Sequence, residues 1–141
     1  MKLKFNTDGF AVPVDPKLIK QLELLTEKED LPVNVTSLVV NFRDKSYSHD
    51  LGGYHPVEIR IYLEEGMWNF DYITDFSYQG GVYPELAAEV DFDFRNNRLS
   101  VSFVPPMPIS ADLDFFKLWQ GNFLAYLLSG AFDEIKVSWD C

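Results

Sequence analysis

Apolar and polar residues alternate over much of the chain, which is the period of a strand with one buried face. In the clearest stretch, residues 57–63, apolar side chains occupy the odd positions and mostly polar ones the even positions. Aromatic residues follow the same period in residues 68–78, so we expect Phe76 to pack inward and Asp75 to face outward. The expected strands are 33–42, 57–63, 68–78, 90–94 and 99–103, in a sheet over about residues 33–104, with a last short strand at 134–139.

Short turn sequences separate these strands. Glu64-Glu65-Gly66 is typical of a tight turn, and Asn96-Asn97 predicts a hairpin with a two-residue turn because asparagine tolerates positive φ. The proline-rich run 105–108 should end the sheet, since proline has no backbone N–H to donate to a sheet ladder. Strands joined in sequence by hairpins favour an antiparallel sheet.

Apolar residues recur at helical spacing in two segments, one before and one after the expected strands in the sequence. Asp15 followed by Pro16 predicts a capped helix over about residues 16–28. Ser110 can cap a second helix over about residues 110–129. The sequence therefore predicts a single α+β domain, residues 1–141, in which a twisted antiparallel β-sheet is flanked by an N-terminal and a C-terminal α-helix.

The second helix is apolar around most of its circumference. A helix with this pattern is largely buried or is shared with another subunit. We expect a homo-oligomer in which Phe115, Trp119 and Phe123 pack across subunits.

The net charge of the chain disfavours some classes of binding partner. Acidic residues outnumber basic ones 22 to 12, giving a formal charge of −10, which opposes binding to nucleic-acid phosphates and to anionic membranes. The first eight residues lack the apolar stretch of a secretory signal, and Cys141 is the only cysteine, so we expect a cytoplasmic protein without a disulfide. A protein partner, basic in character, fits this charge best.

Seven acids and one base, Arg60, share the outward phase of the expected strands; the seventh acid, beside the six binding candidates, is Glu64. Like charges on adjacent strands need solvent, cations or a basic partner, so this face is either a binding surface or a solvated exterior. A chelated metal is not expected there, because alternate strand residues lie roughly 6.6 Å apart on a flat face. The candidate binding residues are Glu58, Asp71, Asp75, Glu89, Asp91 and Asp93.

Motifs for the common hydrolases, nucleotide-binding sites and zinc proteases are absent, and no cofactor is predicted. The two histidines, His49 and His55, lie in a polar glycine-containing loop with Asp50 and Glu58. A histidine near carboxylates can act as a general base or metal ligand, so a small hydrolase or metal-dependent enzyme using loop 49–58 is one alternative. A second alternative is a DNA-mimic inhibitor of a basic protein, whose carboxylates would imitate phosphates.

Three stretches carry a family resemblance: residues 52–60 (GGYHPVEIR), residues 68–76 (WNFDYITDF) and residues 91–94 (DFDF). With them the chain resembles the bacterial DUF2787 family, which is similar in fold to the acidic mitochondrial matrix glycoproteins. Those proteins include a binder of complement globular heads and form oligomers from an antiparallel sheet with terminal helices. The resemblance implies this fold and a binding role, and it brings no catalytic residues. We expect a non-enzymatic protein-binding or assembly module.

Overall fold

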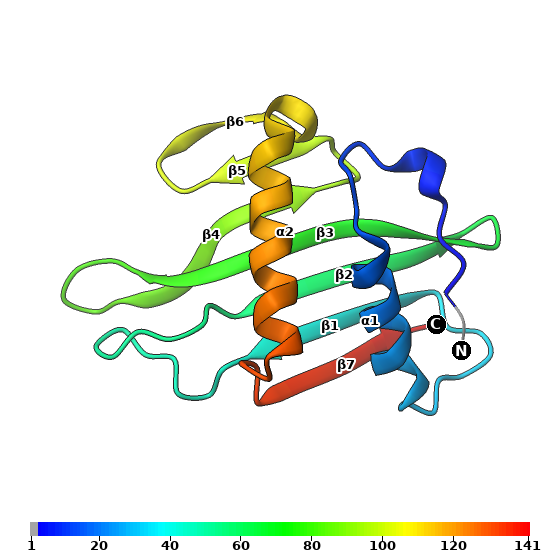
Figure 1. Ribbon diagram of the computed structural model, residues 1–141, viewed down its shortest axis with the longest axis horizontal. Coiled ribbons are helices and arrows are strands. Elements are labelled where there is room, and N and C mark those ends of the chain that lie inside the picture. The colour runs from blue at the N-terminus through cyan, green and yellow to red at the C-terminus, as the bar shows by residue number, and fades with distance from the viewer. Residues whose placement is uncertain (1–2) are drawn as a thin grey trace.

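Seven antiparallel strands form one sheet, and two α-helices pack against one of its faces in the computed structural model, which describes residues 3–141 (Figure 1). The spatial order of the strands is β6-β5-β4-β3-β2-β1-β7. The expected α+β class is confirmed. The elements are η1 (Thr7–Gly9), α1 (Pro16–Glu27), β1 (Ser37–Arg43), β2 (Val57–Glu64), β3 (Met67–Gln79), β4 (Glu85–Asp93), β5 (Arg98–Val101), β6 (Val104–Pro108), η2 (Ile109–Asp112), α2 (Leu113–Leu128) and β7 (Glu134–Asp140).

Both helices begin at an aspartate cap. The Asp15 carboxylate accepts a hydrogen bond from the backbone N–H of Lys17, so the predicted start of α1 is confirmed. The predicted cap of the second helix is wrong, because Ser110 lies inside the short η2 turn. Asp112 caps α2 instead and accepts a hydrogen bond from the N–H of Phe115 at 3.0 Å. Neither helix within residues 3–141 combines the length and hydropathy needed to cross a bilayer.

The prolines at residues 105–108 do not end the sheet as predicted. They belong to β6, which pairs with β5 and forms one edge of the sheet. Proline is tolerated at an edge because the missing N–H groups can face away from the neighbouring strand. The strand predicted near the C-terminus is confirmed as β7, which pairs with β1 and forms the opposite edge.

The turn between β2 and β3 is the predicted tight turn. Glu65 and Gly66 both have positive φ, and the flanking residues Glu64 and Met67 are paired. The two-residue turn predicted at Asn96-Asn97 is wrong, because the loop spans residues 94–97 between the paired Asp93 and Arg98.

A β-bulge in β3 changes which residues face the helices. Arg60 pairs with Tyr72 and Ile61 with Phe70, so Asp71 is an extra residue without an opposite partner. Asp71 and Tyr72 then both contact residues of the sheet face turned away from the helices. A bulge re-aims the side chains that follow it.

Beyond this bulge the alternation in β3 is shifted by one residue. Ile73 is fully buried, and Asp75 points toward α2, where Trp119 donates to it. Phe76 is only half-buried and lies outside the hydrophobic cluster. The predicted inward packing of Phe76 and outward direction of Asp75 are therefore wrong, because the pattern assumed an uninterrupted strand.

A second bulge lies between β3 and β4. Asp75 pairs with Val90 and Phe76 with Ala88, which leaves Glu89 as the extra residue in β4. The two bulges lie on neighbouring strands, on either side of the middle of β3, one at Asp71 and the other opposite Asp75 and Phe76. Together they bring acidic side chains to the helix-covered face.

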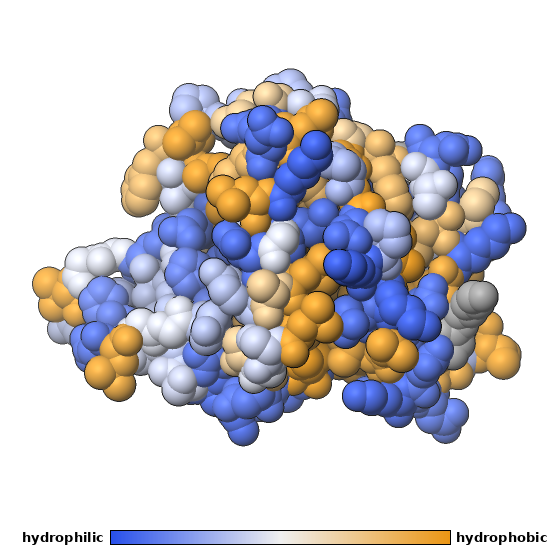
Figure 2. Space-filling view, viewed as in Figure 1, coloured by the Kyte–Doolittle hydropathy of each residue, from blue (hydrophilic) through white to orange (hydrophobic). Residues whose placement is uncertain are grey.

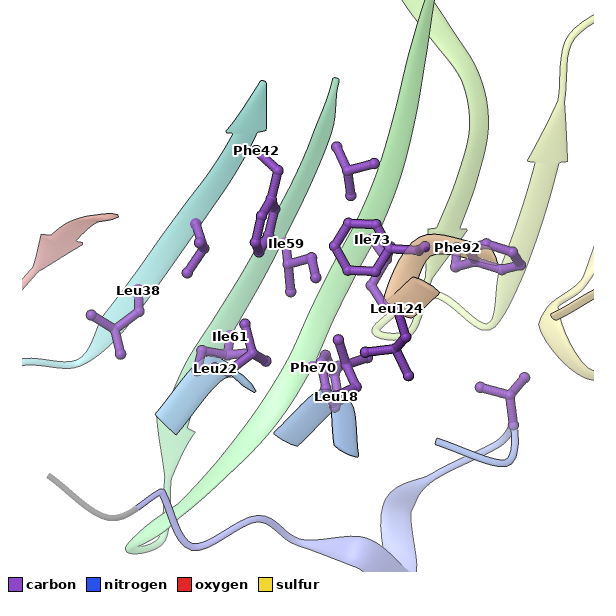
Figure 3. Packing of buried hydrophobic residues seen from close by; sticks show 14 of the residues in the cluster. Leu18, Leu22, Leu38, Phe42, Ile59, Ile61, Phe70, Ile73, Phe92 and Leu124 are labelled. Atoms are coloured by element: carbon purple, nitrogen blue, oxygen red, sulfur yellow. The ribbon is translucent and has the colours of Figure 1, made fainter. Parts of the chain in front are cut away.

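The hydrophobic core fills the layer between the sheet and the helices (Figure 3). Leu18 and Leu22 of α1 and Leu124 of α2 meet the inward residues of the central strands, among which Phe92 is fully buried. Phe92 packs against three aromatic residues of α2, Phe115, Phe116 and Trp119. Some of the apolar side chains of α2 are thus buried against the sheet of the same chain.

Candidate functional site

His55 lies at the helix-covered face of the sheet, just before β2. It is two residues ahead of Val57 and shares the inward phase of Val57 and Ile59. Its Nδ1 atom is 2.8 Å from Oδ1 of Asp75 and 3.2 Å from Oε2 of Glu89. One ring nitrogen therefore lies within hydrogen-bond distance of carboxylates from two different strands.

The Asp75 carboxylate is held by contacts with two residues, Trp119 of α2 and His55 before β2. The indole Nε1–H of Trp119 in α2 donates to Oδ2 of Asp75 at 2.9 Å, while Oδ1 faces His55. The side chain of Asp75 is 15% exposed, compared with 40% for Glu89. Asp75 is thus the positioned, largely buried member of the pair, and Glu89 is the accessible one.

These groups form the floor of a cavity of about 450 Å³ beneath α2, here called the α2 pocket. Six of its thirteen lining residues are Phe, Tyr or Trp, and its carboxylates and imidazole come from Asp75, Glu89 and His55, a composition typical of ligand sites. The lining residues are Gly53, Tyr54, His55, Val57, Asp75, Glu89, Val90, Phe115, Trp119, Asn122, Phe123, Tyr126 and Phe132.

The two carboxylates raise the pKa of His55 above its ordinary value. The hydrogen bond to Asp75 is the largest cause, partial burial opposes it, and the charges of Asp75 and Glu89 add to it. Protonation of His55 therefore competes with any other cation for these carboxylates, because all three groups share one small volume.

The loop that carries His55 is held by Asp44. The Asp44 carboxylate accepts from the backbone N–H groups of Tyr54 and Ser46 and from the Ser46 hydroxyl. Gly53 passes so close that a Cβ there would lie 2.9 Å from Asp44 Oδ2, and its φ is +131°. Glycine is required at this position for both reasons.

The expectation that the six candidate binding acids share the outer face is wrong for Asp75 and Glu89, which the two bulges bring into the α2 pocket. Glu58, Asp71, Asp91 and Asp93 remain on or beside the outer face. Glu58 accepts a hydrogen bond from the Tyr72 hydroxyl at 2.6 Å, and Asp71 pairs with Arg60. These outer acids are already engaged with their own chain.

Crowding on the outer face changes the pKa of two groups. Partial burial, followed by the charges of Asp93 and Asp71, raises the pKa of Asp91, and a hydrogen bond from Thr74 opposes this rise. Burial and the bond to Glu58 raise the pKa of Tyr72. Both shifts favour the uncharged forms.

The enzyme site predicted in loop 49–58 is not assembled. His49 and Asp50 are exposed, and Glu58 bonds to Tyr72 on the opposite face of the sheet from His55. Only His55 of this group enters the pocket. Its partners come from the acidic set instead, which the sequence pattern could not reveal because it placed them on the other face.

The pocket offers two kinds of chemistry for a cation. His55, Asp75 and Glu89 present ligand atoms within 4.8 Å of one another, a spacing that a divalent cation could use. The carboxylates beneath aromatic rings also suit an ammonium or guanidinium group, which ring faces attract. The sequence pattern predicts Trp119 and Phe115 as core or interface residues, and it carries no separate signal for their place in a pocket.

An antiparallel sheet with helices on one face and an acidic, partly aromatic pocket beneath α2 makes this a small α+β protein with a recessed pocket. The chain belongs to the family described as "Protein of unknown function (DUF2787)", whose model matches residues 16–138.

Two solved structures from Vibrio cholerae resemble the chain over almost its entire length. Hypothetical protein VC0508, from the VSP-II pathogenicity island, is 39% identical with a TM-score of 0.90, covering 99% of this chain and 100% of that one. Conserved hypothetical protein VC1805, from the VPI-2 island, is 37% identical with a TM-score of 0.77, covering 91% and 96%. VC1805 is described as sharing structural homology with the human P32 protein, in agreement with the expected fold similarity. No curated protein matches the sequence.

Proposed function

We propose that this protein is a non-enzymatic protein-binding module that takes a basic side chain of its partner into the α2 pocket. The observation that carries the proposal is the convergence of Asp75 and Glu89 on the floor of an aromatic-walled cavity. Two carboxylates from separate strands are directed into one small space, and a cation is the complementary ligand.

The walls of the pocket suit the stem and head of an arginine or lysine. These side chains pack their methylene groups against apolar surface and keep the charge at the tip. Tyr54, Trp119 and Tyr126 supply ring surface around the carboxylates. An arginine head could donate to Glu89 and stack on a ring at the same time.

Binding fits the pocket better than hydrolysis does. His55 and Asp75 resemble the base and its orienting carboxylate in a hydrolytic triad. The described lining, however, contains no serine, threonine, cysteine or lysine that could act as the nucleophile.

The outer face is the weaker candidate for a basic partner. Its carboxylates accept hydrogen bonds from Tyr72 and Thr74 or pair with Arg60. Two permanently charged arginines, Arg60 and Arg95, lie within ion-pair distance of Asp71, whereas the cation beside Asp75 and Glu89 is the titratable ring of His55. The same contacts disfavour the DNA-mimic alternative, which needs free carboxylates.

Affinity capture from a native bacterial lysate tests the proposal with a charge-reversed pair of variants. Glu89→Lys places an ammonium in the pocket, and Glu64→Lys makes the same charge change at the exposed end of β2. We expect proteins retained by the wild type and by Glu64→Lys to be lost from Glu89→Lys. Equal retention by Glu89→Lys, with its melting temperature unchanged, would refute the proposal, as would the absence of any retained protein.

A further inference from the structure

A second hollow adjoins the α2 pocket at the end of the sheet that no helix covers. It has a volume of about 480 Å³ and shares Glu89, Val90 and Phe115 with the α2 pocket. In Figure 1, α2 crosses the strands, α1 lies to its right, and the strand ends and loops to its left are uncovered. We call this second hollow the rim hollow; its remaining lining residues are Ser77, Tyr78, Gln79, Gly80, Val101, Ser102 and Phe103.

The two hollows follow one another beside α2. Phe115 and Tyr126 of this helix both line the α2 pocket and lie about 16 Å apart along the helix axis, at roughly 1.5 Å per residue. The rim hollow joins the α2 pocket at the Phe115 end and extends it further. Roughly five residues of extended chain cover that length at about 3.3 Å each. The joined hollows therefore have the length of a short peptide rather than of a single side chain.

Phe103 gives the rim hollow an apolar lip. It lies in the turn between β5 and β6, is 98% exposed and has a φ of +66°. A bulky residue at positive φ is an outlier whose backbone cost the fold must offset elsewhere. Figure 2 shows apolar surface at this turn, in the upper left of the molecule.

We propose that the occupant is an extended segment of a protein partner, about five residues long. Its basic side chain meets Asp75 and Glu89, and an apolar side chain about two positions away packs against Phe103 and Phe115. The inference rests on the proposed function and extends it from one side chain to a linear motif. Carboxylates in one hollow and an apolar lip on the next supply two separate points of recognition.

Selection from a random linear heptapeptide phage library on the immobilised protein, in buffer containing EDTA, tests this inference. We expect enrichment of sequences with arginine or lysine about two positions from leucine, isoleucine or phenylalanine. A fluorescein-labelled consensus peptide is then titrated by fluorescence anisotropy. Glu89→Gln should weaken its binding roughly tenfold and Phe103→Ser roughly fivefold, whereas the controls Glu64→Gln and Leu51→Ser should stay within about twofold.

The variants separate the two proposals. If basic peptides are selected and Glu89→Gln weakens them but Phe103→Ser does not, the extended motif is overturned and the single-pocket function stands. If no basic residue is enriched, or if Glu89→Gln has no effect, both proposals fail. Binding that appears only when zinc replaces EDTA would also overturn them, because the carboxylates would then serve a metal.

Discussion

His55 is the residue whose surroundings differ most from what the sequence suggests. A histidine beside glycine and proline in a polar loop is ordinarily an exposed turn residue. Here its ring nitrogen faces Asp75 of β3 and Glu89 of β4, and its ring lies 5.3 Å from that of Tyr47. Trp119 reaches the same carboxylate from α2. A titratable ring in this position links stability to pH.

We expect the melting temperature of the wild type to fall relative to that of His55→Gln as the pH rises from about 6 to about 9. The pKa of His55 is raised in the folded state, so protonation stabilises that state. This contribution is fully present below the unfolded pKa of about 6.5 and is lost as the pH passes through the higher folded pKa. The exposed His49→Gln variant is the control and should follow the wild type. Parallel curves for all three proteins would show that the carboxylates do not stabilise the charged ring.

For Asp91, unlike His55, the charged form of the side chain is expected to destabilise the folded state. Its pKa is raised mainly by burial, so its ionisation costs stability in the folded state. The side-chain oxygen of an asparagine in its place could still accept the hydrogen bond from Thr74, which Asp91 accepts at 2.7 Å. We expect Asp91→Asn to raise the melting temperature by roughly 1–3 °C at about pH 7, and to leave it unchanged near pH 3, where the carboxyl is protonated. Thermal unfolding followed by circular dichroism measures both, and the exposed Asp50→Asn should have no effect at either pH.

At the scale of elements, the sequence predicts strands and helices better than it predicts their faces. Residues 57–63 alternate as expected in β2, where Val57, Ile59 and Ile61 are buried, and only Leu63 near the end of the strand is exposed. β3 also lies where the pattern places it, yet its far half faces the other way. A bulge depends on which residue lies opposite on the next strand, and local periodicity does not contain that pairing.

The candidate site escapes prediction for the same reason. Its residues are all candidates in the sequence, with Asp75 and Glu89 among the acids and His55 in the loop. The pattern assigns them to separate features because an unbroken period of two places Asp75 on the outer face. The β-bulges at Asp71 in β3 and at Glu89 in β4 bring these side chains together in one pocket. The family resemblance supplies the fold but no site residues.

Alanine substitutions of phenylalanines in β3 and β4 test which side chains of these strands face the core. We expect Phe92→Ala to lower the free energy of unfolding by about 3–5 kcal/mol, because its ring is fully buried against three aromatic residues of α2. Phe76→Ala should cost roughly 1 kcal/mol or less, since its ring lies outside the core after the bulge. Urea unfolding of the two variants measures the difference. Equal losses would mean that β3 keeps a single phase.

In the molecule as a whole, one side of α2 remains exposed to solvent. Phe123 is buried and stacks with Trp119 over the pocket, so Phe123 packs within its own chain. Phe115 and Trp119 are half-buried, and their packing across subunits stays a prediction. Leu118 and Leu128 remain 63% and 60% exposed. The surface available for self-association is therefore the outer side of the helix, and it is aliphatic more than aromatic.

We expect a mass above the 16.3 kDa of one chain by light scattering at micromolar concentration. Leu118→Glu should shift the mass to that of the monomer and leave the circular dichroism spectrum unchanged. The control Val33→Glu introduces the same charge at another fully exposed apolar residue and should not change the mass. A monomer for the wild type would show that the exposed leucines are simply solvated.

The proline-rich edge strand limits how the sheet can grow. β6 holds three of its five residues as proline and cannot offer a continuous row of donors to an incoming strand. Strand addition is left to β7 at the opposite edge. Two copies joined there about a two-fold axis would leave only β6 edges outermost, so polymerisation into a fibre would terminate after one step.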